Sequence, residues 1–168
     1  MDAEVVNKFV ISAQGVLETE IGGPVKTGRL SVQTVPYTSQ QITTLIGIAG
    51  SIQGVMLIGL SEETAKSLVS RMIGHRIAEF NELAQSGIAE MGNVIAGAAL
   101  TDLSAQGYSC TLSPPTLIIG SGTTICTVDI KRLVLPMITS YGPVEIQLAL
   151  RLSGEARSNA FAKGDIRC

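Results

Sequence analysis

Charge is scarce in this chain, and neither sign is concentrated. Only 15% of its 168 residues are charged, and the formal net charge is −2. The longest basic run is Lys131-Arg132, far short of the Lys/Arg footprint needed to bind a phosphate backbone. We therefore expect no nucleic-acid partner. Because hydrophobic residues make up 45% of the chain, it is typical of a folded domain rather than of a disordered segment.

Histidine and cysteine, the common ligands of transition metals, are nearly absent. His75 is the only histidine, and it follows a predicted helix end at Gly74. The three cysteines, Cys110, Cys126 and Cys168, contain no Cys-x-x-Cys pair. An odd number of widely spaced cysteines argues against a disulfide framework and against a zinc site. We expect no metal site and no cofactor of the chain's own.

Long apolar runs are missing as well. Residues 42–60 and 128–141 come nearest, but Gly, Ser, Thr, Gln or charged residues interrupt both. A membrane-spanning helix needs roughly 18 or more consecutive apolar residues. Asp2 and Glu4 precede the first apolar residues, the reverse of the basic start of a signal peptide. We expect a cytoplasmic protein with no membrane partner.

Hydrophobic periodicity predicts helices and strands in a repeated order. Apolar residues at spacings of three and four, with glycine at the ends, predict helices over about residues 3–21, 61–74 and 77–106. Segments with short turns between them predict strands over residues 25–35, 41–50, 51–60, 116–120, 123–140 and 144–153. A helix followed by three strands therefore occurs twice, about 80 residues apart.

This order of elements favours an α+β fold. Strands joined by short turns predict a mainly antiparallel sheet with the helices packed on one side. We expect residues 1–153 to form a single domain. Residues 154–168 lack apolar periodicity and are predicted to be a disordered tail.

The helix predicted over residues 77–106 carries an acid and an amide side by side. Glu90 and Asn93 are three positions apart, so their side chains leave the same face with Cβ atoms about 5–6 Å apart. Ser86 and Gly97 fall on the same line of the helix. The opposite side is predicted to be apolar, and its members are Ala84, Ile88, Met91, Ile95 and Ala98.

Small residues surround the acid–amide pair. Gly87, Gly92 and Gly97 interrupt the helix, and each glycine costs roughly 1 kcal/mol relative to alanine. Such glycines need a compensating role, such as the close approach of another backbone. Ala89, Gly92, Ala96 and Gly97 are expected to flank the pair, and Gly97, on the polar line, is assigned to the approach of a partner.

The pattern Glu-x-x-Asn-x-x-x-Gly on a long helix, here Glu90, Asn93 and Gly97, resembles the signature of the CheC/CheX/FliY chemotaxis phosphatases. The resemblance covers roughly residues 5–153 and includes the paired prolines Pro114-Pro115 after the signature helix. It implies an enzyme that hydrolyses the aspartyl phosphate of a phosphorylated CheY-like response regulator.

The resemblance also implies roles for individual residues. Asn93 would position the attacking water, and Glu90 would hold the regulator's active-site lysine. Ser86 and Gly97 are predicted contacts with the partner. Mg²⁺ is expected in the regulator's active site. Because an acyl phosphate is already labile, placing a water is the main task left to the phosphatase.

The first predicted helix separates branches of this family. Residues 9–14 contain no second acid–amide pair, and a single site resembles the CheX branch, whose members form homodimers. Exposed edges predicted along residues 123–140 and 144–153 point to a homodimer too, because unpaired strands favour pairing with another chain. The alternative is a non-catalytic adaptor that binds a response regulator or the flagellar switch. The intact Glu90/Asn93 pair favours the phosphatase.

Overall fold

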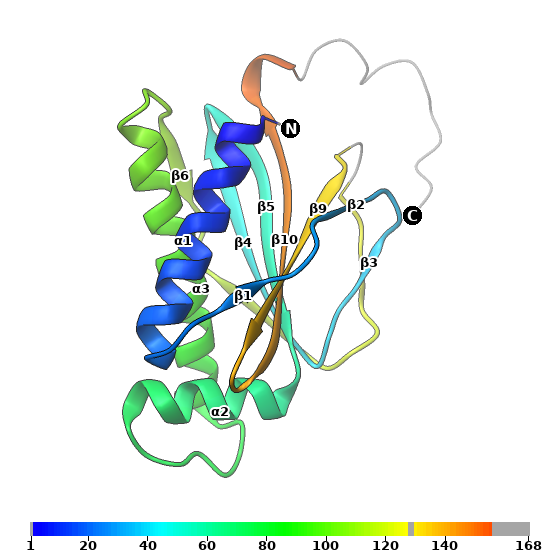
Figure 1. The fold of residues 1–168 in the computed structure, drawn as a ribbon. Helices are drawn as coiled ribbons and strands as arrows, with labels where there is room; N and C mark the ends of the chain where they lie inside the picture. Colours follow the sequence, from blue (N-terminus) through cyan, green and yellow to red (C-terminus); the bar gives the residue numbers. More distant parts are fainter. Residues whose placement is uncertain (1, 128–129, 156–168) are drawn as a thin grey trace.

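Helices cover one side of a curved antiparallel sheet in the computed structural model, which describes residues 2–127 and 130–155 (Figure 1). The helices are α1 (Ala3–Ile21), α2 (Glu62–Ile73) and α3 (Glu82–Ser104). The strands are β1 (Lys26–Thr27), β2 (Ser31–Gln33), β3 (Tyr37–Thr38), β4 (Ile42–Gly50), β5 (Ile52–Leu60), β6 (Cys110–Leu112), β7 (Thr116–Ile119), β8 (Thr124–Ile125), β9 (Arg132–Thr139) and β10 (Gly142–Leu152). A short 3₁₀ turn, η1 (Ser153–Glu155), follows β10.

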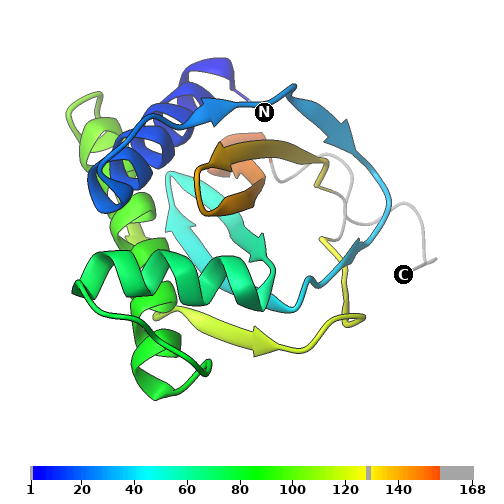
Figure 2. The same ribbon diagram turned by 60° about the horizontal axis from the view of Figure 1, so that its bottom comes forward.

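The sheet has the order β1-β9-β10-β5-β4-β6, and every pairing in it is antiparallel. β2 lies next to β1 along β9, and β7 lies next to β6 along β4. β3 and β8 form a separate pair. Seen from the α2 end, the strands curl around a central hairpin, with the helices on one side (Figure 2). The predicted α+β class with a mainly antiparallel sheet is confirmed.

The sheet pairs two similar halves of the chain with each other. The first half runs from α1 to β5 and the second from α3 to β10. β1 and β2 of the first half pair with β9 of the second, just as β6 and β7 of the second pair with β4 of the first. β5 and β10, the last strand of each half, meet at the centre. The repeat predicted from the order of elements is therefore present, and its halves are interleaved.

The first helix has the bounds that the sequence predicts, because both ends are capped. The Asp2 carboxylate accepts a hydrogen bond from Glu4 N at 2.8 Å, which satisfies a backbone donor that a helix start leaves without a partner. Gly22 ends the helix with a φ of 67°, a left-handed conformation that favours glycine. Between the caps, Phe9, Ala13 and Leu17 are fully buried.

The third helix begins later than predicted. The sequence predicts a start at about Ile77, but α3 begins at Glu82. The Asn81 side chain accepts a hydrogen bond from Ala84 N at 3.1 Å and caps the helix. The preceding residues form a loop instead, held where Ile77 N donates to Ser70 Oγ at 2.8 Å.

Two of the predicted strands are divided, and the predicted sheet edges are wrong. Residues 25–35 form only the short strands β1 and β2, and the described part of residues 123–140 forms β8 and β9. β9 and β10 were expected at the margin, but each is paired on both sides. The outer positions belong instead to β1 and β2 on one side and to β6 and β7 on the other.

Two further expectations concern membrane-spanning helices and the C-terminal tail. None of the helices in the described ranges is long and apolar enough to cross a membrane. The tail predicted over residues 154–168, which includes Cys168, lies outside the described residues from residue 156 onward.

Candidate functional site

α3 presents one face to the sheet and the opposite face outward. Four of the five residues predicted for its apolar side are buried, and Ala98 is half-buried. Gly92 and Ala96 are buried as well. A Cβ built on Gly92 would lie 3.2 Å from Ile46 Cδ1 and 3.2 Å from Thr44 Cγ2. The expectation that Gly92 and Ala96 flank the acid–amide pair is therefore wrong, since they let α3 approach the sheet closely.

The other two glycines of α3 have different surroundings. A Cβ on Gly87 would lie 2.9 Å from Val69 Cγ1, so this glycine allows α2 to pack closely against α3. Around Gly97 no atom lies within 4 Å of a built Cβ, and the glycine has no positive φ. Close contacts among the described residues thus explain Gly87 and Gly92. Gly97 carries the cost of glycine in a helix, although no described atom lies where its side chain would be.

Glu90 and Asn93 lie on the outward side of α3, with Ser86 one turn earlier. Ser86 and Glu90 are exposed, and Asn93 is half-buried. Within the described ranges, none of these three side chains has a hydrogen bond or ion pair to the rest of the chain. Their donors and acceptors are therefore available to a partner, as a site that acts on another molecule requires.

An exposed valine adjoins the pair and was missed in the sequence. Val94 follows Asn93 and is 41% exposed. The sequence pattern could have revealed it, because this apolar residue lies four positions after Glu90, on the line of the helix that otherwise carries polar or small residues. Beside a carboxylate and an amide, it gives this face an apolar contact for a partner.

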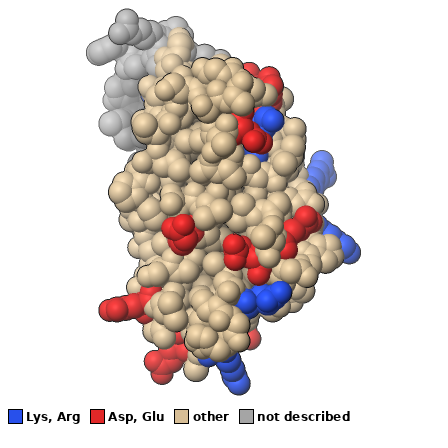
Figure 3. All heavy atoms as spheres, turned by 90° about the vertical axis from the view of Figure 1, so that its left-hand side faces the viewer, with Lys and Arg blue, Asp and Glu red and all other residues tan. Residues whose placement is uncertain are grey.

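The surface on the helix side of the molecule carries few charges. Figure 3 views the side on which α1 and α3 lie in Figure 1, and most of that surface belongs to uncharged residues. The acidic side chains on it are scattered and form no dense cluster. On such a surface, a single exposed carboxylate such as Glu90 can attract a cation on a partner, because basic neighbours on α3 do little to neutralise it.

The equivalent position on α1 has a structural role instead. The buried residues of α1 and α3 follow the same spacing, and aligning Phe9 with Ile88 places Ile11 and Gln14 where α3 carries Glu90 and Asn93. Gln14 Nε2 donates to Glu18 Oε1 at 3.0 Å, and Val25 N donates to the same carboxylate oxygen at 3.2 Å.

These bonds join the end of α1 to the segment leading into β1. The hydrogen bond from Gln14 is also the largest cause of the lowered pKa of Glu18. The α1 positions that align with Glu90 and Asn93 thus carry no acid–amide pair, although Glu4 and Asn7 stand three positions apart nearer the start of α1.

Candidate metal ligands are sparse in the described part of the chain. It contains no group of three or more His, Cys, Asp or Glu side chains that could hold a metal ion. Cys110 and Cys126 are both half-buried. His75 follows the C-terminal cap of α2, as predicted, and lines a pocket to which neither Glu90 nor Asn93 contributes.

Comparison with known proteins places this site in a family context. The family described as "Chemotaxis phosphatase CheX" matches residues 42–138, a stretch that contains α3. The chain is 35% identical over 121 residues to the protein named CheY-P phosphatase CheX of Thermotoga maritima, covering 71% of this chain and 78% of that protein.

Two solved structures are similar over most of the chain. The chemotaxis protein CheX of Vibrio vulnificus matches with a TM-score of 0.79 and 25% identity, covering 89% of this chain and 100% of that one. CheX of Borrelia burgdorferi, in a complex with CheY, BeF₃ and Mg²⁺, matches with a TM-score of 0.74 and 24% identity, covering 87% and 97%.

The fold and the family match together define the class of protein, an α+β phosphatase of bacterial chemotaxis. The chain belongs to the chemotaxis phosphatase CheX family.

Proposed function

We propose that this chain hydrolyses the aspartyl phosphate of a CheY-like response regulator, with Asn93 and Glu90 as its catalytic residues. One observation carries the assignment of residues. In a member of the CheX family, Glu90 and Asn93 lie on the outward side of the long helix without internal partners among the described residues. Two polar side chains held on a rigid helix and left unpaired are suited to reach into another protein's active site.

The proposed chemistry needs little from the phosphatase itself. The carboxamide of Asn93 has both a donor and an acceptor, so it can orient a water for in-line attack on the phosphorus. Because the amide is neutral, it does not repel the phosphoryl oxygens. The carboxylate of Glu90 pairs with the regulator's lysine and fixes the register of the two proteins. The phosphoryl–oxygen bond to the aspartate breaks, and inorganic phosphate leaves.

The Mg²⁺ that the reaction needs would come from the partner. The Borrelia burgdorferi relative was solved with CheY, BeF₃ and Mg²⁺, which supports a regulator that brings its own Mg²⁺ to this chain's site. Ser86 and Gly97 lie one turn to either side of the pair and are proposed contacts with the regulator. Since such regulators act in the cytoplasm, we propose the same location for this chain.

A dephosphorylation time course with a phosphorylated regulator from the same organism tests the proposal. We expect Asn93→Ala to lower the rate by at least ~100-fold, because losing a positioned water costs several kcal/mol of barrier. The free energy of unfolding should change by about 0.5 kcal/mol or less. Asn7→Ala, which removes an exposed amide from α1, is the control and should keep the wild-type rate. Full activity in Asn93→Ala would refute the residue assignment.

Binding and stoichiometry separate the enzyme from an adaptor. With an acid–amide pair on α3 and none at the aligned positions of α1, calorimetry should show one regulator bound per chain. Two regulators per chain would contradict the single site. A wild-type protein that binds the phosphorylated regulator without accelerating hydrolysis would be a non-catalytic adaptor.

We also propose a homodimer, formed at the edge that carries β2. This edge strand is short, and the apolar residues Leu30, Val32 and Val35 in and beside it are 44%, 60% and 60% exposed. β2 pairs with β9 on one side only, and an open strand edge beside exposed apolar side chains favours pairing with a second copy. Light scattering should give twice the 17.6 kDa chain mass, and Val32→Asp should shift the protein to the monomer. A wild-type monomer at micromolar concentration would rule the dimer out.

A further inference from the structure

A groove runs along the outer face of α2, away from Glu90 and Asn93. It encloses about 850 Å³, a volume within the range of roughly 300–1,000 Å³ common for small-molecule sites. Its lining comes from α2, from the loop that follows α2, and from the turn between β9 and β10. The lining residues are Glu63, Lys66, Ser67, Ser70, Arg71, Gly74, His75, Arg76, Ile77, Ala78 and Tyr141.

Hydrogen bonds and close packing hold the walls of this groove in place. Ser70 Oγ donates to Lys66 O at 2.6 Å and accepts from Ile77 N at 2.8 Å, which fixes the loop against α2. On the other side, Tyr141 N donates to Thr139 Oγ1 at 3.1 Å. A Cβ on Gly142 would collide with Thr64, so the turn that carries Tyr141 packs directly on α2. The groove is therefore formed before any ligand arrives.

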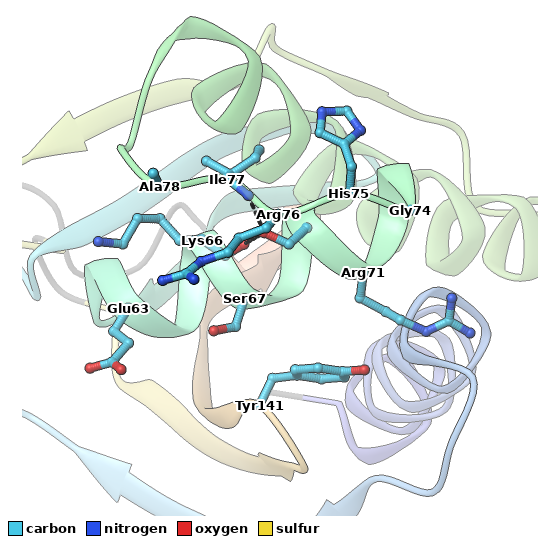
Figure 4. A pocket seen from close by; sticks show the side chains of 11 residues that line it. Glu63, Lys66, Ser67, Arg71, Gly74, His75, Arg76, Ile77, Ala78 and Tyr141 are labelled. Carbon is cyan, nitrogen blue, oxygen red and sulfur yellow. Dashed lines mark hydrogen bonds between the residues drawn. The ribbon is translucent and has the colours of Figure 1, made fainter.

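Positive charge gathers in the groove although the chain as a whole is acidic. Lys66, Arg71 and Arg76 line it against one acid, Glu63. In Figure 4, Lys66, Arg76 and Glu63 lie toward one end, and Arg71 reaches toward α1 at the other. His75 also lines the groove, and its ring points away from Tyr141.

Several donors in the groove are uncommitted. In the described part of the chain, the Arg76 guanidinium and the hydroxyls of Ser67 and Tyr141 have no hydrogen bond or ion pair. Lys66 pairs only with Glu62, at 3.4 Å, and a surface pair of this kind contributes about 0–1 kcal/mol, so a ligand can displace it.

We propose that this groove binds a small phosphate-bearing anion, specifically a nucleotide. Arg76 and Lys66 carry the charge for the phosphate oxygens, and the Ser67 hydroxyl in the lining adds a further donor. The ring of Tyr141, along the opposite side in Figure 4, offers the flat apolar surface that a base contacts. The proposal is independent of the phosphatase assignment, because neither Glu90 nor Asn93 lines the groove.

Isothermal titration with ATP and with inorganic triphosphate tests this site without any regulator present. Both should bind saturably with dissociation constants below about 1 mM, and binding should weaken as NaCl is raised, since salt screens exposed charges. Arg76→Gln should weaken both ligands at least about tenfold, because a charged hydrogen bond to phosphate is lost. Arg29→Gln, an exposed arginine outside the groove, is the matched control and should bind as the wild type does.

Tyr141→Leu distinguishes a nucleotide from phosphate alone. It should weaken ATP binding several-fold while leaving triphosphate binding unchanged. If Tyr141→Leu binds ATP as tightly as the wild type, the nucleotide assignment is wrong. If neither ligand binds at millimolar concentration, or if Arg76→Gln and Arg29→Gln lose affinity equally, the whole site is wrong.

Discussion

Replacing Gly97 by alanine should affect the stability of α3 and the docking of a partner in opposite directions. A Cβ at this position meets no atom within 4 Å. Alanine should therefore stabilise the helix by up to about 1 kcal/mol. In a domain of this size, that gain raises the melting temperature by about 2–4 °C. Thermal unfolding followed by circular dichroism measures this effect directly.

The same methyl group should impair docking if a regulator's backbone approaches Gly97. Overpacking an interface costs about 1–3 kcal/mol, so half-maximal dephosphorylation should need roughly tenfold more phosphorylated regulator. The combination expected for Gly97→Ala is thus a more stable protein and a poorer phosphatase. A variant that gains stability and keeps its wild-type concentration dependence would refute the docking role of Gly97.

Gly87→Ala is the internal contrast on the same helix. Its Cβ would lie 2.9 Å from Val69 Cγ1 and 3.0 Å from Val69 Cγ2, and a β-branched side chain has little rotamer freedom to move away. The overpacking cost of about 1–3 kcal/mol should exceed the gain in helix propensity, so the melting temperature should fall. Dephosphorylation per folded molecule should stay unchanged. A raised melting temperature would mean that α2 and α3 separate more easily than their packing indicates.

Two further predictions concern other side chains. Glu90→Ala should remove most of the dephosphorylation activity, whereas Glu82→Ala, an exposed acid earlier on α3, should retain it; equal losses would point to general charge rather than to a specific contact. Gln147→Leu should lower the free energy of unfolding by about 1–3 kcal/mol, because Arg132 is only 4% exposed and its Nε donates to Gln147 Oε1 at 2.7 Å. Urea denaturation measures that loss, and an unchanged midpoint would show that Arg132 finds another acceptor.

Local signals in the sequence were sufficient for the bounds of α1 and α2 and for the hairpin of β4 and β5. Asp2, Gly22, Ser61 and Gly74 each cap a helix where the sequence predicts one to begin or end. Gly50, with a φ of 121°, forms the predicted turn between the two strands. These features depend on residues close together in the chain, so a single sequence contains them.

Long-range features were harder to predict, for a physical reason. Whether a strand lies at an edge depends on which distant strand pairs with it, and periodicity contains no such information. This is why β9 and β10 were wrongly placed at the margin. The wrong prediction for Gly92 has a similar cause. Gly92 faces the sheet because Ile46 and Thr44 approach it there, and those two residues belong to a distant segment of the chain. The polar line through Glu90 was predictable because it needs only helical spacing.

The interleaving of the two halves has a consequence for how this chain folds. The central strand pair joins residues 52–60 to residues 144–152, and β9 pairs with strands near the start of the chain. Few of these contacts can form while the second half is still being synthesised. A topology dominated by such distant pairings folds slowly, because the entropy of closing long loops is lost before many contacts form. Until β10 inserts between β5 and β9, both of those strands expose pairing edges, and unpaired edges of this kind are where partly folded chains associate.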